Sequence, residues 1–221
     1  MTVLTNHLHK EGNNINSQYK DTITLAVTGA SGSGYFLCLL QTLVDANVKV
    51  YLLLSEAAQI VLKTEVGESW PHDNEALNAF LMTRFNSKHG QIIPLTAKDW
   101  FSPVASGSSS PQKMVICPCS CGTLAAIAQG LSSNLIQRSA DVVFKERGQL
   151  IVMPRETPLS TVHLKNMLTL SELGATVMPL APGFYHKPNS IEDLQAFMVA
   201  RVMDHLKIDH DISKRWVEEQ Y

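Results

Sequence analysis

Short apolar segments alternate with segments of helical periodicity along almost the whole chain. The apolar segments resemble buried strands and occupy residues 23–29, 48–55, 91–95, 113–118, 149–153 and 175–180. Between them, apolar residues recur at helical spacing in residues 33–46, 56–65, 75–85, 122–130, 134–146, 160–173 and 190–206. This alternation requires crossover connections between parallel strands. We therefore predict a single-domain, three-layer α/β fold, Rossmann-like or flavodoxin-like, with a parallel sheet and helices on both faces.

The 221 residues suffice for one large domain with a substantial core. Residues 1–20 are polar and irregular, and they lack the apolar core of a signal peptide. We expect them to form a flexible N-terminal tail, followed by one domain over residues 21–221. Residues 100–111 are rich in Ser, Pro and Gly and predict a long loop, of the kind that is usually functional or mobile.

Charge and cysteine content exclude several classes of protein. The formal net charge is −2 and Lys and Arg form no run, which argues against nucleic-acid binding. No apolar segment approaches the length of a membrane span. Three of the four cysteines form Cys117-Pro-Cys119-Ser-Cys121, a spacing that suits neither a relaxed disulfide nor a zinc site. We therefore expect a reduced, cytoplasmic protein without a metal.

Two Gly- and Ser-rich turns each follow a predicted strand and open a predicted helix. The first is Thr-Gly-Ala-Ser-Gly-Ser-Gly at residues 28–34, and the second is Cys-Ser-Cys-Gly-Thr at residues 119–123. Small residues let a ligand approach the backbone, and free N–H groups at a helix start favour anions. The first spacing is not a dinucleotide fingerprint, and Ser55 rather than an acidic residue ends the second strand. A nucleotide-like or flavin ligand across both turns is predicted; a tight turn and an ordinary helix N-cap are the alternatives.

Arg155 and Glu156 stand between two prolines directly after the predicted strand at residues 149–153. They must emerge at the carboxyl end of that strand, where open α/β sheets bind their ligands. A guanidinium and a carboxylate there suit an anionic ligand and a proton transfer, and a salt bridge on the rim is the alternative. Glu65 is a second candidate proton carrier, because a carboxyl in a partly dry cleft has a raised pKa.

Other polar side chains could bind a second anion. Arg138 and Lys145 lie two turns apart on one face of a predicted helix. Arg201 lies in the otherwise apolar stretch 197–203, where a charge needs a partner. Tyr185, in the Pro- and Gly-containing turn 182–188, can present a hydroxyl over a cleft. A solvated helix face and simple packing are the alternatives.

From residue 23 to residue 216 the chain resembles the UbiX flavin prenyltransferase family. The motifs that carry the resemblance are TGASG, PVASGSS, ICPCS followed by GTL, NLIQRSADVVFKER, PRETPLS, HLKNML and APGFYH. The resemblance implies a homo-oligomer, usually a dodecamer, that binds FMN at a subunit interface. It implies transfer of a dimethylallyl group from dimethylallyl monophosphate to N5 and C6 of reduced FMN, without a metal. The prenylated FMN then passes to a UbiD-type decarboxylase, often in ubiquinone biosynthesis.

The resemblance also implies a role for individual residues. Those expected to contact FMN are Gly29, Ala30, Ser31, Ser55, Ser120, Cys121, Gly122, Thr123 and Arg155. Those expected to bind dimethylallyl phosphate are Arg138, Lys145, Tyr185, Arg201 and, beside the prenyl group, Trp216. Those expected to act in catalysis are Glu65, Glu156, Ser31 and Lys145. Cys121 stands where Thr is common in the family, and Ser33-Gly34 varies the first turn; both leave backbone donors in place.

Two other functions suit the same fold. An FMN-dependent cysteine decarboxylase would be expected to contain a PASANT-like loop and a PxMNxxMW-like segment. Residues 103–109 do not match the first motif, and residues 154–157 do not match the second. A non-catalytic flavin carrier would not need the second set of anion-binding residues. Both comparisons favour the prenyltransferase.

Overall fold

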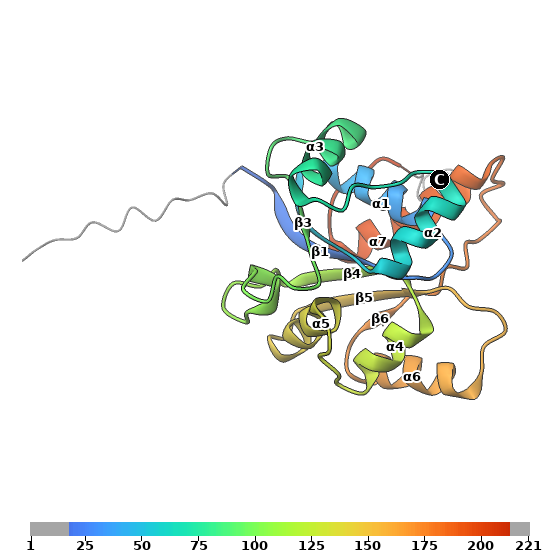
Figure 1. Cartoon of the computed structure of the whole chain (residues 1–221). Coiled ribbons are helices and arrows are strands. Elements are labelled where there is room, and N and C mark those ends of the chain that lie inside the picture. Colours follow the sequence, from blue (N-terminus) through green and yellow to red (C-terminus); the bar gives the residue numbers. More distant parts are fainter. Residues whose placement is uncertain (1–17, 213–221) are drawn as a thin grey trace, which may run out of the picture.

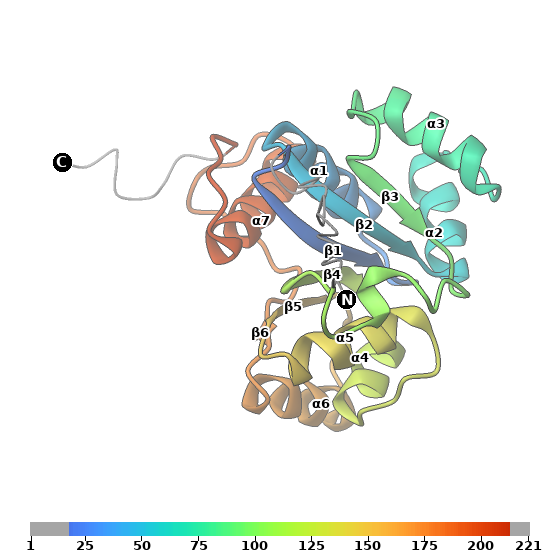
Figure 2. The same cartoon turned by 90° about the vertical axis from the view of Figure 1, so that its left-hand side faces the viewer.

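The computed structural model describes residues 18–212. Most of the predicted N-terminal tail, and Trp216 with the end of the predicted domain, lie outside the described residues. Within them, six parallel strands form one sheet in the order β3-β2-β1-β4-β5-β6 (Figure 2). The strands are β1 (Asp21–Val27), β2 (Val48–Leu54), β3 (Ile92–Leu95), β4 (Lys113–Cys119), β5 (Gln149–Pro154) and β6 (Thr176–Val177).

Helices cover both faces of the sheet, which confirms the predicted layers (Figure 1). One face carries α1 (Ser33–Asp45), α2 (Glu56–Val66), α3 (Asn74–Phe85) and α7 (Ile191–Leu206). The other carries the short 3₁₀ helix η2 (Pro103–Ala105), α4 (Cys121–Ala128), α5 (Leu135–Lys145) and α6 (Thr161–Glu172). In residues 18–212, none of these helices has the length and apolarity that crossing a membrane requires.

The molecule has two hydrophobic cores, one on each face of the sheet. Ile23 and Leu25 of β1 pack toward α1 and α7, whereas Ala26 packs into the core under α4 and α5. The same alternation holds in β4, where Val115 and Ile116 belong to opposite cores. Because both faces are covered, the central strands are buried throughout, which accounts for their uninterrupted apolar sequences.

The order of the strands reverses between β1 and β4. From β1 the chain proceeds outward to β2 and β3, and then returns to place β4 against the other side of β1. A crevice at the carboxyl ends of the strands on either side of such a reversal is the general ligand site of open α/β sheets. The two predicted Gly- and Ser-rich turns follow β1 and β4, so they flank this reversal.

The predicted strand at residues 175–180 is wrong in length, since β6 contains Thr176 and Val177 alone. The chain stays beside β5 beyond that point, because the amides of Met178 and Leu180 donate to the carbonyls of Val152 (2.8 Å) and Pro154 (3.0 Å). Pro154, at the end of β5, has no N–H group to donate back to the carbonyl of Met178, so the regular ladder ends there. The predicted loop at residues 100–111 is irregular apart from η2.

The turn from α5 into β5 is tightly packed at Gly148. A Cβ at this position would lie 2.5 Å from the carbonyl oxygen of Gln112. That carbonyl also accepts the first hydrogen bond of β5, from the amide of Gln149 (2.7 Å). We expect Gly148→Ala to lower the free energy of unfolding of the cofactor-free protein by about 1–3 kcal/mol, measured by denaturant titration.

Gly122→Ala is the matched control, because a Cβ at Gly122 would meet no atom within 4 Å. We expect its free energy of unfolding to stay within about 1 kcal/mol of the parent. Equal stability of the two variants would show that the turn before β5 relaxes freely.

Candidate active site at the carboxyl ends of the strands

A buried threonine joins the two turns that flank the reversal of strand order. The hydroxyl of Thr28 donates to the carbonyl of Pro118 (3.0 Å) and accepts from the amide of Ser120 (2.7 Å). The amide of Thr28 donates to the same Pro118 carbonyl (3.2 Å). The turn after β1 and the turn after β4 are thereby fixed side by side. The predicted FMN-binding residues of both turns are brought to one place.

Serine caps begin the helices that follow β2 and β4. The hydroxyl of Ser55 accepts from the amide of Ala58 (3.1 Å), and that of Ser120 accepts from the amide of Thr123 (3.3 Å). Both hydroxyls therefore act as ordinary N-caps, which for Ser120 is the alternative that the sequence left open. The helix starts still point backbone N–H groups and the positive end of the helix dipole toward the crevice.

Two glycines of the turns have different reasons to be glycine. A Cβ on Gly29 would lie 2.5 Å from the Cβ of Ala57, so Gly29 lets the first turn of α2 pack against the turn after β1. A Cβ on Gly122 would meet nothing within 4 Å, so open space adjoins the start of α4. The second position leaves room for a ligand to approach the backbone.

Arg155 reaches the same edge from β5. Cys119 pairs with Pro154 across β4 and β5, so the residues that follow them emerge together. The Nε atom of Arg155 is buried, and no hydrogen-bond acceptor within residues 18–212 reaches it. A buried donor without an acceptor costs free energy comparable to a lost hydrogen bond. This atom therefore indicates that an acceptor group of a ligand belongs beside it.

Glu156 and Cys121 are neighbours at this edge. Glu156 is exposed, and one of its carboxylate oxygens accepts from the amide of Thr157 (3.1 Å). Burial, and next to it the carboxylate of Glu156, raise the pKa of the Cys121 thiol. Cys121 is therefore a neutral thiol at neutral pH rather than a thiolate.

Glu65 reaches from α2 to the start of α1. Its carboxylate accepts from the amides of Gly32 (3.1 Å) and Ser33 (2.8 Å). Partial burial raises the pKa of Glu65, but hydrogen bonds from the Ser31 hydroxyl and these two amides outweigh it and hold the pKa below the ordinary value of 4.5. The side chain is thus an ionised acceptor that fixes the turn carrying Ser31.

The four predicted phosphate-binding residues form two pairs on opposite faces of the sheet. Arg138 and Lys145 belong to α5, where the Nε atom of Arg138 donates to the carbonyl of Ala105 (3.2 Å). Arg201 belongs to α7, and Tyr185 packs edge-on against Phe197, one turn earlier on that helix (ring centroids 5.6 Å apart). A single chain therefore does not bring all four together. Trp216 lies outside the described residues.

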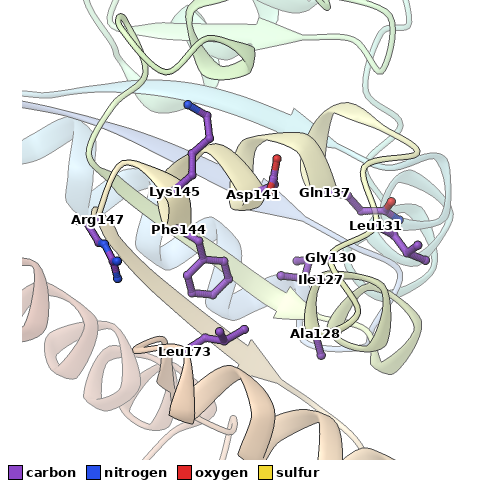
Figure 3. A pocket seen from close by; sticks show the side chains of 10 residues that line it. All are labelled: Ile127, Ala128, Gly130, Leu131, Gln137, Asp141, Phe144, Lys145, Arg147 and Leu173. Carbon is purple, nitrogen blue, oxygen red and sulfur yellow. The ribbon is translucent and has the colours of Figure 1, made fainter.

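A surface pocket of about 480 Å³ lies between α4, α5 and the end of α6 (Figure 3). Among the predicted site residues that the structure describes, Lys145 alone lines it, and its ammonium group points away from Phe144 and Leu173. None of the pocket's described lining residues belongs to the turns after β1 and β4. The sequence contained no signal for it.

Sequence reasoning also missed three residues that hold the candidates in place. Thr28 was read only as part of a turn. Asp141 and Asp204 were not singled out, yet they bind Arg138 (2.8 Å) and Arg201 (2.9 Å). The spacing of Arg and Asp three residues apart on one helix was the available signal.

Comparison with known proteins identifies close relatives. The family model described as Flavoprotein matches residues 11–203. The flavin prenyltransferase UbiX of Pseudomonas aeruginosa is 51% identical over 199 residues, which cover 90% of this chain and 95% of the relative.

Two solved structures extend the similarity to the fold. AnUbiX (PadA1), described as a complex with FMN and dimethylallyl pyrophosphate, is 36% identical with a TM-score of 0.77, over 89% of this chain and 97% of that one. A dodecameric FMN-dependent UbiX-like decarboxylase from Escherichia coli O157:H7 is 34% identical with a TM-score of 0.76, over 88% and 98%.

The hydrogen bonds of Glu65 predict a pH-dependent contribution to stability. Because the folded-state pKa of Glu65 is lowered, its contribution is complete above the ordinary carboxyl pKa and is lost as the pH falls through the folded-state value. Glu65→Gln should lower Tm at pH 7 by about 2–4 °C, the size expected for loss of a helix cap. The difference from the parent should shrink below pH 4.5.

Glu172→Gln, which removes an exposed carboxylate from α6, is the control and should leave Tm unchanged. Thermal unfolding monitored by circular dichroism between pH 3.5 and 8 measures both variants. A Glu65→Gln deficit that stays constant down to the lowest pH would contradict an ionised cap.

Proposed function

The chain belongs to the UbiX flavin prenyltransferase family, and we propose that it joins a dimethylallyl group from dimethylallyl monophosphate to N5 and C6 of reduced FMN. The observation that carries the proposal is the buried Nε of Arg155, unpaired within residues 18–212, at the edge of the sheet where two helices begin. The complex described for AnUbiX (PadA1), with FMN and dimethylallyl pyrophosphate, supports the same pair of ligands.

The residues of the crevice fit FMN. Backbone groups of Gly29 and Ser31 and the helix starts at Ser55 and Ser120 would offer donors to an anionic or ring-edge acceptor. The amide of Ala30 already donates to the carbonyl of Thr28 (2.9 Å), so Ala30 would contribute contact rather than a donor. Open space beside Gly122 admits a flat ring, and Arg155 supplies a further donor. When bound, reduced FMN supplies the nucleophilic atoms N5 and C6.

The phosphate of the second substrate requires residues from two copies of the chain. Arg138 and Lys145 would come from one copy, and Tyr185 and Arg201 from its neighbour. The dodecameric assembly described for the relative from Escherichia coli O157:H7 supports such an arrangement. Cations at this place stabilise the phosphate more strongly as it leaves, because its charge grows when the C–O bond breaks.

The two carboxylates have different environments. Glu65 is ionised with a lowered pKa, which makes it a weak base but a firm anchor for Ser31. Glu156 is exposed in the single chain, so FMN and a neighbouring copy would remove water from it on binding. Desolvation raises a carboxyl pKa toward neutrality, where it transfers protons efficiently. We assign proton transfer to Glu156 and the positioning of Ser31 to Glu65.

The proposal extends to the wider reaction. The enzyme works as a homo-oligomer, a dodecamer, in the cytoplasm and without a metal. Its product, prenylated FMN, passes to a UbiD-type decarboxylase. Trp216 would border the prenyl group.

Direct product analysis tests the activity. Purified protein, reduced FMN and dimethylallyl monophosphate should yield a flavin heavier by one prenyl unit in mass spectrometry. Arg138→Ala and Glu156→Gln should each lower its rate of formation by about 100-fold while FMN still binds, because each removes one group acting on the developing charge or proton. Absence of the heavier flavin would favour a decarboxylase or a flavin carrier, and full activity of both variants would remove these assignments.

Mixing experiments test whether two copies share the site. Arg138→Ala and Arg201→Ala homo-oligomers, at a dimethylallyl monophosphate concentration near the parent KM, should each react about 100-fold more slowly than the parent. Oligomers formed from an equal mixture of the two chains should recover about one quarter of the parent activity, because that fraction of randomly assembled interfaces contains both arginines. A mixture of two separately assembled variants is the control. Failure of the co-assembled mixture to exceed it would place both arginines in the same copy of the chain.

A further inference from the structure

Asp204 stands between two basic side chains at the end of α7. Its Oδ2 atom accepts from Nη1 of Arg201 (2.9 Å), and its Oδ1 atom lies 3.2 Å from Nε2 of His210. Each carboxylate oxygen thus has a separate partner. The side chain of Arg201 is 51% exposed, whereas that of His210 is 4% exposed. The pair therefore links a surface guanidinium to a buried ring.

His210 is held in place by the way α7 ends. Lys207 adopts the left-handed conformation at the helix C-cap (φ 56°), and the chain turns back on itself there. The amide of Ile208 then donates to the carbonyl of Met203 (3.0 Å), and the Ile208 side chain is buried in the core. The ring of His210 is consequently fixed against the last turn of the helix.

From this arrangement we infer that Asp204 is a positioning residue for Arg201, and that His210 holds Asp204 in place through its other carboxylate oxygen. The inference rests on the proposed role of Arg201 in phosphate binding. Within residues 18–212, Nη1 is the one atom of the Arg201 guanidinium that makes a hydrogen bond, so no acceptor there occupies the Nε–Nη2 edge of this half-exposed side chain. That edge has the geometry for a bidentate contact with a phosphate.

The effect of the contact is to order Arg201 before the substrate arrives. A half-exposed arginine otherwise samples many rotamers and loses that freedom when it binds an anion. Asp204 also offsets part of the arginine charge. It therefore weakens the long-range attraction of Arg201 for a phosphate while it orients the Arg201 side chain. Arg138 shows the related arrangement with Asp141 (2.8 Å), but its Nε is already bound to the Ala105 carbonyl. Arg201 is therefore the arginine whose orientation depends most on one carboxylate.

A double-mutant cycle separates positioning from ordinary structural support. Steady-state rates are measured for the FMN-loaded oligomer at varied dimethylallyl monophosphate. Asp204→Ala should raise KM about 10-fold, the effect of one charge-assisted hydrogen bond, with kcat changed less than about 3-fold. The same substitution in an Arg201→Ala background should raise KM no further, because residues that act through one another are not additive. Arg84→Ala, which breaks the surface ion pair with Glu68, is the control and should leave KM unchanged.

Two variants of His210 test the second link. Glutamine can donate from nearly the position of Nε2, so His210→Gln should keep KM near the parent value. His210→Leu fills the buried space without a donor and should raise KM in the direction of Asp204→Ala. An equal loss in both variants would overturn the role of His210.

The outcomes also distinguish this inference from the proposed function. A KM effect of Asp204→Ala that is as large without Arg201 as with it would overturn the positioning role. So would a normal KM in Asp204→Ala when Arg201→Ala raises it. A normal KM in Arg201→Ala itself would instead remove Arg201 from the phosphate site, and the inference with it, while prenylated flavin would still be formed.

Discussion

The two hydrogen bonds of the Thr28 hydroxyl are the interactions on which the geometry of the candidate site depends. This hydroxyl is buried between β1 and β4 and serves as a donor to Pro118 and an acceptor for Ser120. Strand pairing alone aligns the two strands but leaves their terminal turns free to diverge. Because both lone pairs and the proton of a hydroxyl can be used at once, one side chain fixes two turns. The start of α4 is therefore placed beside the turn after β1 before any ligand is bound.

The distribution of cations follows from the layers of the fold. Helices on opposite faces of a sheet are separated by the sheet itself, so α5 and α7 of one chain are unable to surround one small anion. Each helix instead pairs its arginine with an aspartate three residues later, which offsets part of the arginine charge. The proposed site, formed by α5 of one copy and α7 of another, would collect these cations only on assembly. Phosphate binding would then depend on the oligomeric state.

The order of the strands and helices could be predicted from the sequence, but the face of the sheet on which each helix packs could not. The buried strands and α1 followed from apolar periodicity, because burial on both sides of a parallel sheet leaves a continuous pattern. The strand at residues 175–180 was predicted too long, because its own apolar composition does not register the donor missing at Pro154 of the neighbouring strand. Arg138 and Arg201 were both predicted as phosphate ligands, but periodicity does not tell on which side of the sheet a crossover helix packs. The role of Thr28 was invisible for a similar reason, since its two partners are distant in sequence.

The two candidate carboxylates, Glu65 and Glu156, differ in the hydrogen-bond donors that surround them, and this difference suits them to different roles. Glu65 faces two amides and a hydroxyl, all donors, so its charged form is stabilised in the folded chain. Glu156 faces the Cys121 thiol, a weak donor whose own pKa is raised, and the amide of Thr157. A carboxylate with strong fixed donors is a poor proton carrier, whereas one with weak donors responds to the removal of water. A thiol is a weaker donor than a hydroxyl, and the backbone amides at the start of α4 do not depend on the side chain of Cys121. Of the two carboxylates, Glu156 is therefore the one with the weaker donors.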